Sequence, residues 1–143
     1  FIKKHISNSE VIIVLSDFKK VNKSHIVHLE KSGVKVIHRY LENINELYQM
    51  SDFYIFPVRS ELSSIGFPLS VIESLACGVP VFSFRNKTLE EKSISNQIFF
   101  YNNTKQLKNM ILNYKESSSS TTYEYNWKSV SQKVKKIIYN YEA

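Results

Sequence analysis

Residues 57–80, PVRSELSSIGFPLSVIESLACGVP, form the stretch that decides the fold. A short apolar run stops at the proline that opens this stretch, a polar loop follows, and residues 67–77 then predict a helix. Pro68 suits the first turn of the helix, where a missing N–H costs nothing, and Gly78 suits the position after its end. A strand, a loop, a helix and a second strand in this order are typical of a βαβ unit.

The same alternation of strands and helices extends outward from this stretch in both directions. Short β-branched and aromatic runs predict buried parallel strands, and apolar residues at helical spacing between them predict connecting helices. The predicted strands span residues 10–16, 34–37, 53–56, 79–84 and 98–101, and the predicted helices span residues 20–32, 44–50, 67–77, 103–116 and 127–141. We therefore expect a doubly wound α/β fold, with one mostly parallel sheet of five strands and helices on both faces.

The domain organisation follows from the length of the chain and from its two ends. A chain of 143 residues suits one domain, and the serine- and threonine-rich residues 117–125 predict a flexible connector to the last helix. The chain does not begin with Met, and its first residues, including Lys3 and Lys4, read as part of a helix that precedes the first strand. We expect a single domain over residues 1–143 that is a piece of a longer chain.

The charge of the chain limits the class of partner. Nineteen Lys and Arg residues against 13 Asp and Glu residues give a formal net charge of +6, and the lysines are spread along the chain. This charge suits either solubility through scattered surface lysines or an anionic partner, such as a nucleotide or an acidic membrane surface. A nucleic-acid interface would need basic and aromatic residues gathered into a reading surface, which the sequence lacks, so we predict no nucleic-acid partner.

The cysteine and histidine content argues against a disulfide and against a metal site. Cys77 is the only cysteine, so it has no internal partner, and a reducing, cytoplasmic environment is favoured. The four histidines lack a neighbouring cluster of cysteines or carboxylates, so no metal ligands are predicted. No apolar run approaches the roughly 20 residues that cross a bilayer.

The start of the helix over residues 67–77 is the candidate ligand site. In parallel sheets, ligands bind beyond the carboxyl ends of the strands. Free N–H groups and the positive dipole end of a helix attract phosphate there. Gly66, at the end of the loop, would allow the ligand to approach the backbone closely.

Glu73 is the second candidate on this helix. It lies about five residues into the helix, roughly 8 Å along its axis, so it is too far along to cap the helix. Leu69, Ile72 and Ala76 share a different stripe, so the Glu73 carboxylate can leave the core. Two interpretations stay open: the carboxylate binds sugar hydroxyls of a nucleotide, or it is a surface group on a half-exposed helix.

These residues resemble the donor-domain signature of the GT-B family 4 glycosyltransferases, in which D-x-x-x-x-P precedes E-G-F-G-x-x-x-x-E-A-x-A-x-G-x-P-V. The chain has LYQMSDFYIFP at residues 47–57 and IGFPLSVIESLACGVPVFSF at residues 65–84. The matching positions are Asp52, Pro57, Gly66, Phe67, Glu73, Ala76, Gly78, Pro80 and Val81. The resemblance covers residues 10–143. It implies the Rossmann-like, C-terminal donor-binding half of a GT-B fold, without the first strand of the family.

The resemblance also implies a function. Such enzymes are retaining hexosyltransferases that use a UDP-, GDP- or ADP-sugar, with no metal and no further cofactor at the pyrophosphate. Glu73 would bind the ribose of the nucleotide, and the base would lie near residues 38–41. The backbone amides expected to contact the donor sugar and pyrophosphate are those of Gly66, Phe67, Leu69 and Ser70.

The chain departs from the family pattern at three places. Ile65 stands where the family has the glutamate that holds the donor sugar. Glu61, four residues earlier, is a candidate for that role in catalysis, and the alternatives are a different donor sugar or a weakened enzyme. Pro68 removes one N–H donor. The pyrophosphate-binding Arg and Lys of the first family strand and the N-terminal acceptor domain are missing, so this piece alone is predicted to be inactive.

Two other interpretations of the sequence compete with this one. The loss of the first glutamate motivates a non-catalytic, glycosyltransferase-like binding or scaffold domain. An unrelated doubly wound domain such as a receiver is disfavoured, because Asp17 has no acidic pair nearby. For the parent protein, the expected location is the cytoplasm, with the inner face of the membrane as an alternative.

Overall fold

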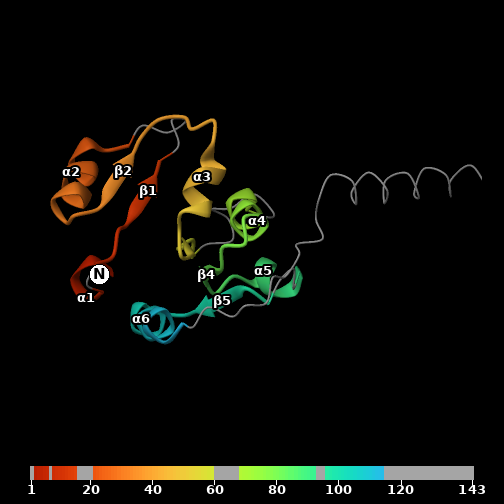
Figure 1. The fold of residues 1–143 in the computed structure, drawn as a ribbon. Coiled ribbons are helices and arrows are strands. Elements are labelled where there is room, and N and C mark those ends of the chain that lie inside the picture. The colour runs from red at the N-terminus through yellow and green to blue at the C-terminus, as the bar shows by residue number, and fades with distance from the viewer. Residues whose placement is uncertain (1, 7, 16–20, 60–67, 93–95, 115–143) are drawn as a thin grey trace, which may run out of the picture. The chain divides into compact units, whose positions relative to one another are not determined.

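The computed structural model describes residues 2–6, 8–15, 21–59, 68–92 and 96–114, here termed the described residues. Helices and strands alternate through most of them, in the order α1-β1-α2-β2-α3-β3-α4-β4-α5-β5-α6 (Figure 1). The chain divides into two compact units. Unit 1 holds the residues up to Ile44 together with Lys108–Tyr114, and Asn45–Leu107 belongs to unit 2.

Unit 1 is built on a parallel pair of strands. Its elements are α1 (Ile2–His5), β1 (Ile12–Val14), α2 (Lys23–Lys31) and β2 (Lys35–Ile37). Ile12 pairs with Lys35, and α2 packs against β2. Asn22 caps α2, because its side chain accepts a hydrogen bond from the Ser24 amide at 3.0 Å. Gly33 follows the helix with φ of +78°, a conformation that glycine adopts without strain.

Unit 2 is built on three parallel strands in the order β3-β4-β5. The elements from α3 onward are α3 (Ile44–Gln49), β3 (Tyr54–Phe56), α4 (Leu69–Ala76), β4 (Val81–Phe84), α5 (Lys87–Lys92), β5 (Ile98–Tyr101) and α6 (Thr104–Asn113). Of these residues, Ile44 and Lys108–Asn113 belong to unit 1. Tyr54 pairs with Val81, and Val81 pairs with Ile98. The helices α4 and α5 therefore serve as the connections between parallel neighbours that a βαβ arrangement requires.

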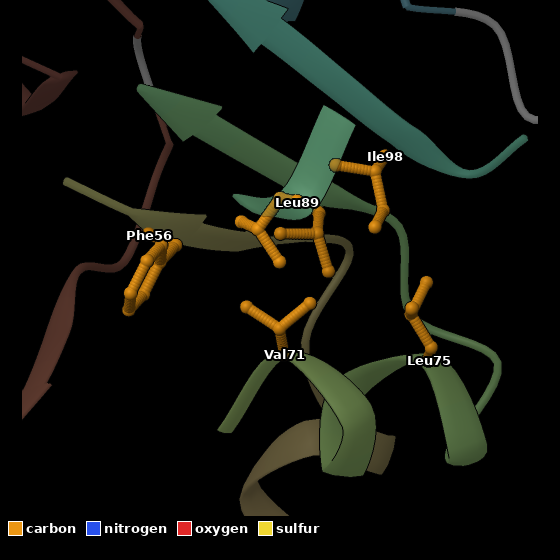
Figure 2. Packing of buried hydrophobic residues seen from close by; sticks show 6 residues of the cluster. Phe56, Val71, Leu75, Leu89 and Ile98 are labelled. Atoms are coloured by element: carbon orange, nitrogen blue, oxygen red, sulfur yellow. The ribbon is translucent and has the colours of Figure 1, made fainter. Parts of the chain in front are cut away.

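The core of unit 2 lies where α4 and α5 meet the sheet. The side chains that α4, α5 and the strands contribute are Phe56, Val71, Leu75, Val81, Leu89 and Ile98. Figure 2 shows this core from close by, with all of these but Val81 labelled. Successive strand residues point to opposite faces. Val81 therefore faces this core, whereas Phe82 faces the other side and packs against the rings of Phe53 and Phe99. Because Val81 and Phe82 are both buried, β4 is a central strand, which explains its continuous apolar run.

The predicted α/β fold with parallel strands is confirmed. All five predicted strands are present, each at its predicted place. Within the described residues, their hydrogen bonds group them as two plus three strands, where the sequence predicts one five-stranded sheet. The short helix α5 was not predicted, because it buries little more than Leu89 in six residues. The predicted connector over residues 117–125 and the predicted helix over residues 127–141 lie outside the described residues.

Candidate functional site

The start of α4 differs from the prediction in the place of Pro68. Pro68 is the cap residue with an extended backbone (φ −70°, ψ 118°), so it precedes the helix and does not lie in the first turn. Its carbonyl accepts the hydrogen bonds of the Val71 and Ile72 amides at 3.1 and 3.5 Å. The amides of Leu69 and Ser70 therefore come before the helical ladder and have no acceptor within the helix.

These are two of the four amides that the sequence predicts as anion ligands. The other two, of Gly66 and Phe67, lie outside the described residues, as do Glu61 and Ile65. The described part of the site thus holds two N–H groups, both at the positive end of an eight-residue helix.

The buried face of α4 also differs from the predicted stripe. Leu69 is 71% exposed and Ala76 is exposed, whereas Val71, Ser74 and Leu75 are buried. The reason is that residues three and four apart share a helix face, and the set that meets β3 and β4 begins at Val71. The Ser74 hydroxyl is satisfied in this core, because it donates to the Val79 carbonyl at 3.0 Å.

Glu73 lies outside the buried face of α4, with its side chain exposed. Its Oε2 accepts a hydrogen bond from the Tyr48 hydroxyl, with 3.4 Å between the oxygen atoms. This separation is longer than that of a typical O–H···O bond, so the contact is weak. Glu73 therefore presents an accessible carboxylate that makes one weak contact with the neighbouring helix α3.

Tyr48 and Glu73 belong to a group of four side chains, the tyrosine–carboxylate cluster, which also contains Tyr54 and Ser70. Tyr48 is 7% exposed, and its ring meets the Tyr54 ring edge-on at 5.6 Å. The Ser70 side chain is hydrogen-bonded to Tyr54. The cluster thus joins α3, β3 and the first two turns of α4, next to the amides of Leu69 and Ser70.

The electrostatics of the cluster keep its hydroxyl groups protonated. Burial, together with nearby Tyr54 and Glu73, raises the pKa of Tyr48 well above its ordinary value. Burial also raises the pKa of Tyr54, although the hydrogen bond with Ser70 lowers it in part. Tyr48 can therefore act as a donor to the carboxylate over the whole physiological pH range.

Cys77, at the end of α4, is placed for a structural role and not for nucleophilic chemistry. Burial and the Glu73 carboxylate both raise the pKa of its thiol. Its Sγ atom lies 4.0 Å from the Asn45 carbonyl oxygen. A raised pKa lowers the fraction of the reactive thiolate at neutral pH.

The sequence pattern did not indicate the contact between Tyr48 and Glu73. The Tyr48 ring is buried in the structure. The two residues are 25 positions apart, and only the packing of α3 near α4 brings them together. A tyrosine that is inward-facing yet near a polar helix face would have been the one available signal, since a buried tyrosine hydroxyl usually finds a polar partner.

A second group of side chains gathers at the carboxyl ends of the strands. The Arg59 guanidinium lies over the Phe84 ring, 5.2 Å from its centre, and the Phe84 ring meets Tyr101 edge-on. Burial raises the pKa of Tyr101, and the charge of Arg59 lowers it in part. Arg59 therefore makes a cation–π interaction with Phe84 at this end of the strands.

Alkaline pH should destabilise the protein through its buried tyrosines. In the folded state the pKa values of Tyr48, Tyr54 and Tyr101 are raised, so the unfolded chain releases these protons first as the pH rises through about 10. The stabilisation is therefore complete below pH 10 and is lost above it. Urea unfolding at about pH 9 and about pH 11 measures the loss, which should be smaller in Tyr48→Phe. An equal loss in both proteins would contradict the assignment to Tyr48.

A comparison with known protein families identifies the family of the chain. The family model of the group 1 glycosyl transferases matches residues 3–115, which is most of the chain and includes Glu73 and all five strands. The chain belongs to the group 1 glycosyl transferases. Neither the curated proteins nor the solved structures contain a match.

Membership in the group 1 glycosyl transferases supports two of the expectations from the sequence. It supports the Rossmann-like glycosyltransferase fold, and it supports glycosyl transfer as the general chemistry. In the part of the chain that the structure describes, no helix is long and apolar enough to span a membrane. In the same part, no three His, Cys, Asp or Glu side chains gather closely enough to form a metal site.

Proposed function

We propose that this chain is the donor-binding domain of a retaining glycosyltransferase that uses a nucleotide-diphosphate sugar. The observation that carries the proposal is the arrangement on α4: two amides without helical acceptors at its start, and one exposed, oriented carboxylate in its second turn. Phosphate is attracted by the first feature and ribose hydroxyls by the second. Membership in a glycosyltransferase family supports the choice of a nucleotide sugar as the ligand that carries both groups.

In this proposal, residues of α4 and of the loop before it bind different parts of the nucleotide. The amides of Leu69 and Ser70, with those of Gly66 and Phe67, bind the pyrophosphate and the donor sugar. Glu73 accepts hydrogen bonds from the ribose. The positive end of the helix offsets the phosphate charge, so that no metal ion is required there.

Catalysis requires more than this chain supplies. We propose that transfer takes place only in the full-length protein, with an acceptor-binding domain and further cationic residues outside this sequence. Glu61 remains the candidate for the donor-sugar contact that the family makes with the glutamate replaced here by Ile65. A protein in which no carboxylate takes that role would bind nucleotides without transferring sugar.

Calorimetric titration of the full-length protein with UDP, GDP and ADP tests the proposal. We expect saturable binding of one of them, in the micromolar to millimolar range, and transfer or slow hydrolysis of the corresponding nucleotide sugar. Binding without any turnover would favour the non-catalytic binding or scaffold domain. The absence of saturable binding for all three nucleotides would reject donor binding itself.

A further inference from the structure

The contact between Tyr48 and Glu73 joins a fixed side chain to a mobile one. The Tyr48 ring is buried and held edge-on by Tyr54 at an interplanar angle of 90°, so its hydroxyl has little freedom to move. Glu73 is exposed and has three rotatable side-chain bonds, so the solvated carboxylate alone would sample several rotamers. A donor that is anchored in the core therefore selects among the directions of an acceptor at the surface.

We propose that Tyr48 is a positioning residue, which orients the Glu73 carboxylate for recognition of both ribose hydroxyls of the donor nucleotide. The inference rests on the proposed function, in which Glu73 is the ribose ligand. Tyr48 does not touch the nucleotide. It acts through Glu73 alone, by a hydrogen bond that reaches Oε2 from the side of α3.

The number of acceptor positions on the carboxylate fits this division of roles. An ionised carboxylate offers about four lone-pair positions on its two oxygen atoms. Tyr48 occupies one position on Oε2, so about three remain for two neighbouring sugar hydroxyls. Hydrogen bonds of this kind are often long before the ligand binds and shorten in the complex, which agrees with the separation of 3.4 Å.

The protonation state of Tyr48 is consistent with a donor role. Burial raises the pKa of its hydroxyl, so the hydroxyl stays protonated and can donate a hydrogen bond at every physiological pH. A hydrogen bond to an ionised acceptor is also stronger than one between two neutral groups. The contact is therefore directional, with Tyr48 donating and Glu73 accepting.

The sharpest readout is the ability of the protein to distinguish ribose from the same sugar without its 2′ and 3′ hydroxyls. A site that hydrogen-bonds a hydroxyl rejects an analogue that lacks it, because its buried or oriented polar groups are left without partners. We define ribose discrimination as the affinity for UDP, GDP or ADP, whichever binds, divided by the affinity for its 2′,3′-dideoxy counterpart. A residue that only stabilises the fold would change both affinities alike and leave this ratio unchanged.

Tyr48→Phe in the full-length protein should lower ribose discrimination about three- to tenfold, the range expected for the loss of one ordinary hydrogen bond. The affinity for the dideoxy nucleotide should stay the same, because the ring and its packing are retained. Tyr101→Phe is the control. It also removes the hydroxyl of a buried tyrosine, but the Tyr101 ring packs against Phe84 on β4, so ribose discrimination should be unchanged.

Glu73→Ala separates failure of this inference from failure of the proposed function. If Glu73→Ala removes discrimination and Tyr48→Phe does not change it, Glu73 binds ribose without help from Tyr48, and the inference is wrong. If the unmodified protein shows no discrimination, or keeps it in Glu73→Ala, the proposed role of Glu73 is wrong. In the doubly substituted protein, Tyr48→Phe should have no further effect on the ratio, because no carboxylate is left to orient.

Discussion

Leu75→Ala is expected to lower the free energy of unfolding by about 2–5 kcal/mol. Leu75 is 2% exposed and lies between α4 and the strands, in the core that also contains Val71, Val81 and Ile98 (Figure 2). Removing its branched side chain deletes buried apolar surface and leaves a cavity that close-packed neighbours fill only in part. Urea denaturation of the protein, with hydrogen exchange of the β4 amides as a local readout, measures the loss.

Leu112→Ala is the control for this prediction, since it is the same substitution at a leucine that is 53% exposed. Its effect should stay within about 0.5–1 kcal/mol, because little buried surface is removed. Equal losses in the two variants would contradict the placement of Leu75 in the core. A loss at Leu75 without faster exchange in β4 would contradict its packing against this sheet.

Glu73→Ala is expected to weaken nucleotide-diphosphate binding to the full-length protein about 10- to 100-fold. The estimate follows from about 1.5–3 kcal/mol for hydrogen bonds to a charged group, at 1.4 kcal/mol for each factor of ten. Folding should be unaffected, because the Glu73 side chain is exposed and its one described hydrogen bond is the weak contact with Tyr48. Calorimetry with the nucleotide that binds the unmodified protein gives the affinity.

Glu91→Ala is the matched control for charge. Glu91 is also an exposed helical glutamate, and its carboxylate lies 3.7 Å from the Lys87 ammonium on α5. Loss of this surface ion pair should leave nucleotide affinity unchanged within error. If both variants bind equally well, Glu73 is a surface residue and the site lies elsewhere. If both weaken binding equally, the effect is a general one of net charge.

The strands were predictable from the sequence because each is a local property of the chain. The runs around Ile13, Val36, Ile55, Phe82 and Phe99 are rich in β-branched and aromatic residues, and each became a parallel strand. Such composition suits strands that are buried on both faces, which is the case for β4. The helix α5 escaped prediction because Leu89 gives a six-residue helix no periodic pattern to detect.

The face of α4 was not predictable in the same way. The sequence LSVIESLA offers two apolar stripes, and the periodicity of the helix fits either of them. The turn from α4 into β4 and the register of β3 against β4 decide that Val71 and Leu75 point inward and Leu69 points outward. These are tertiary constraints, which a pattern within one helix does not contain.

The same distinction between local features and tertiary constraints applies to the candidate site. Leu69, Ser70 and Glu73 could be named from the motif, since a helix start and a carboxylate at a fixed distance from it are local features. The neighbours that set their environment are distant in sequence, such as Tyr48 beside Glu73 and Phe84 beside Arg59. Single-sequence reasoning therefore identifies groups that can bind a ligand, but not the partners that orient them.

The short turn between α4 and β4 has a mechanical consequence. The Gly78 and Val79 amides donate to the Leu75 and Ser74 carbonyls at 3.0 and 2.9 Å, and the Ser74 hydroxyl returns to the Val79 carbonyl. Three hydrogen bonds across so few residues join the end of the helix and the start of the strand into one rigid unit. The groups on α4 then move together with the sheet. The binding of a ligand to this helix therefore costs little conformational entropy for ordering the helix.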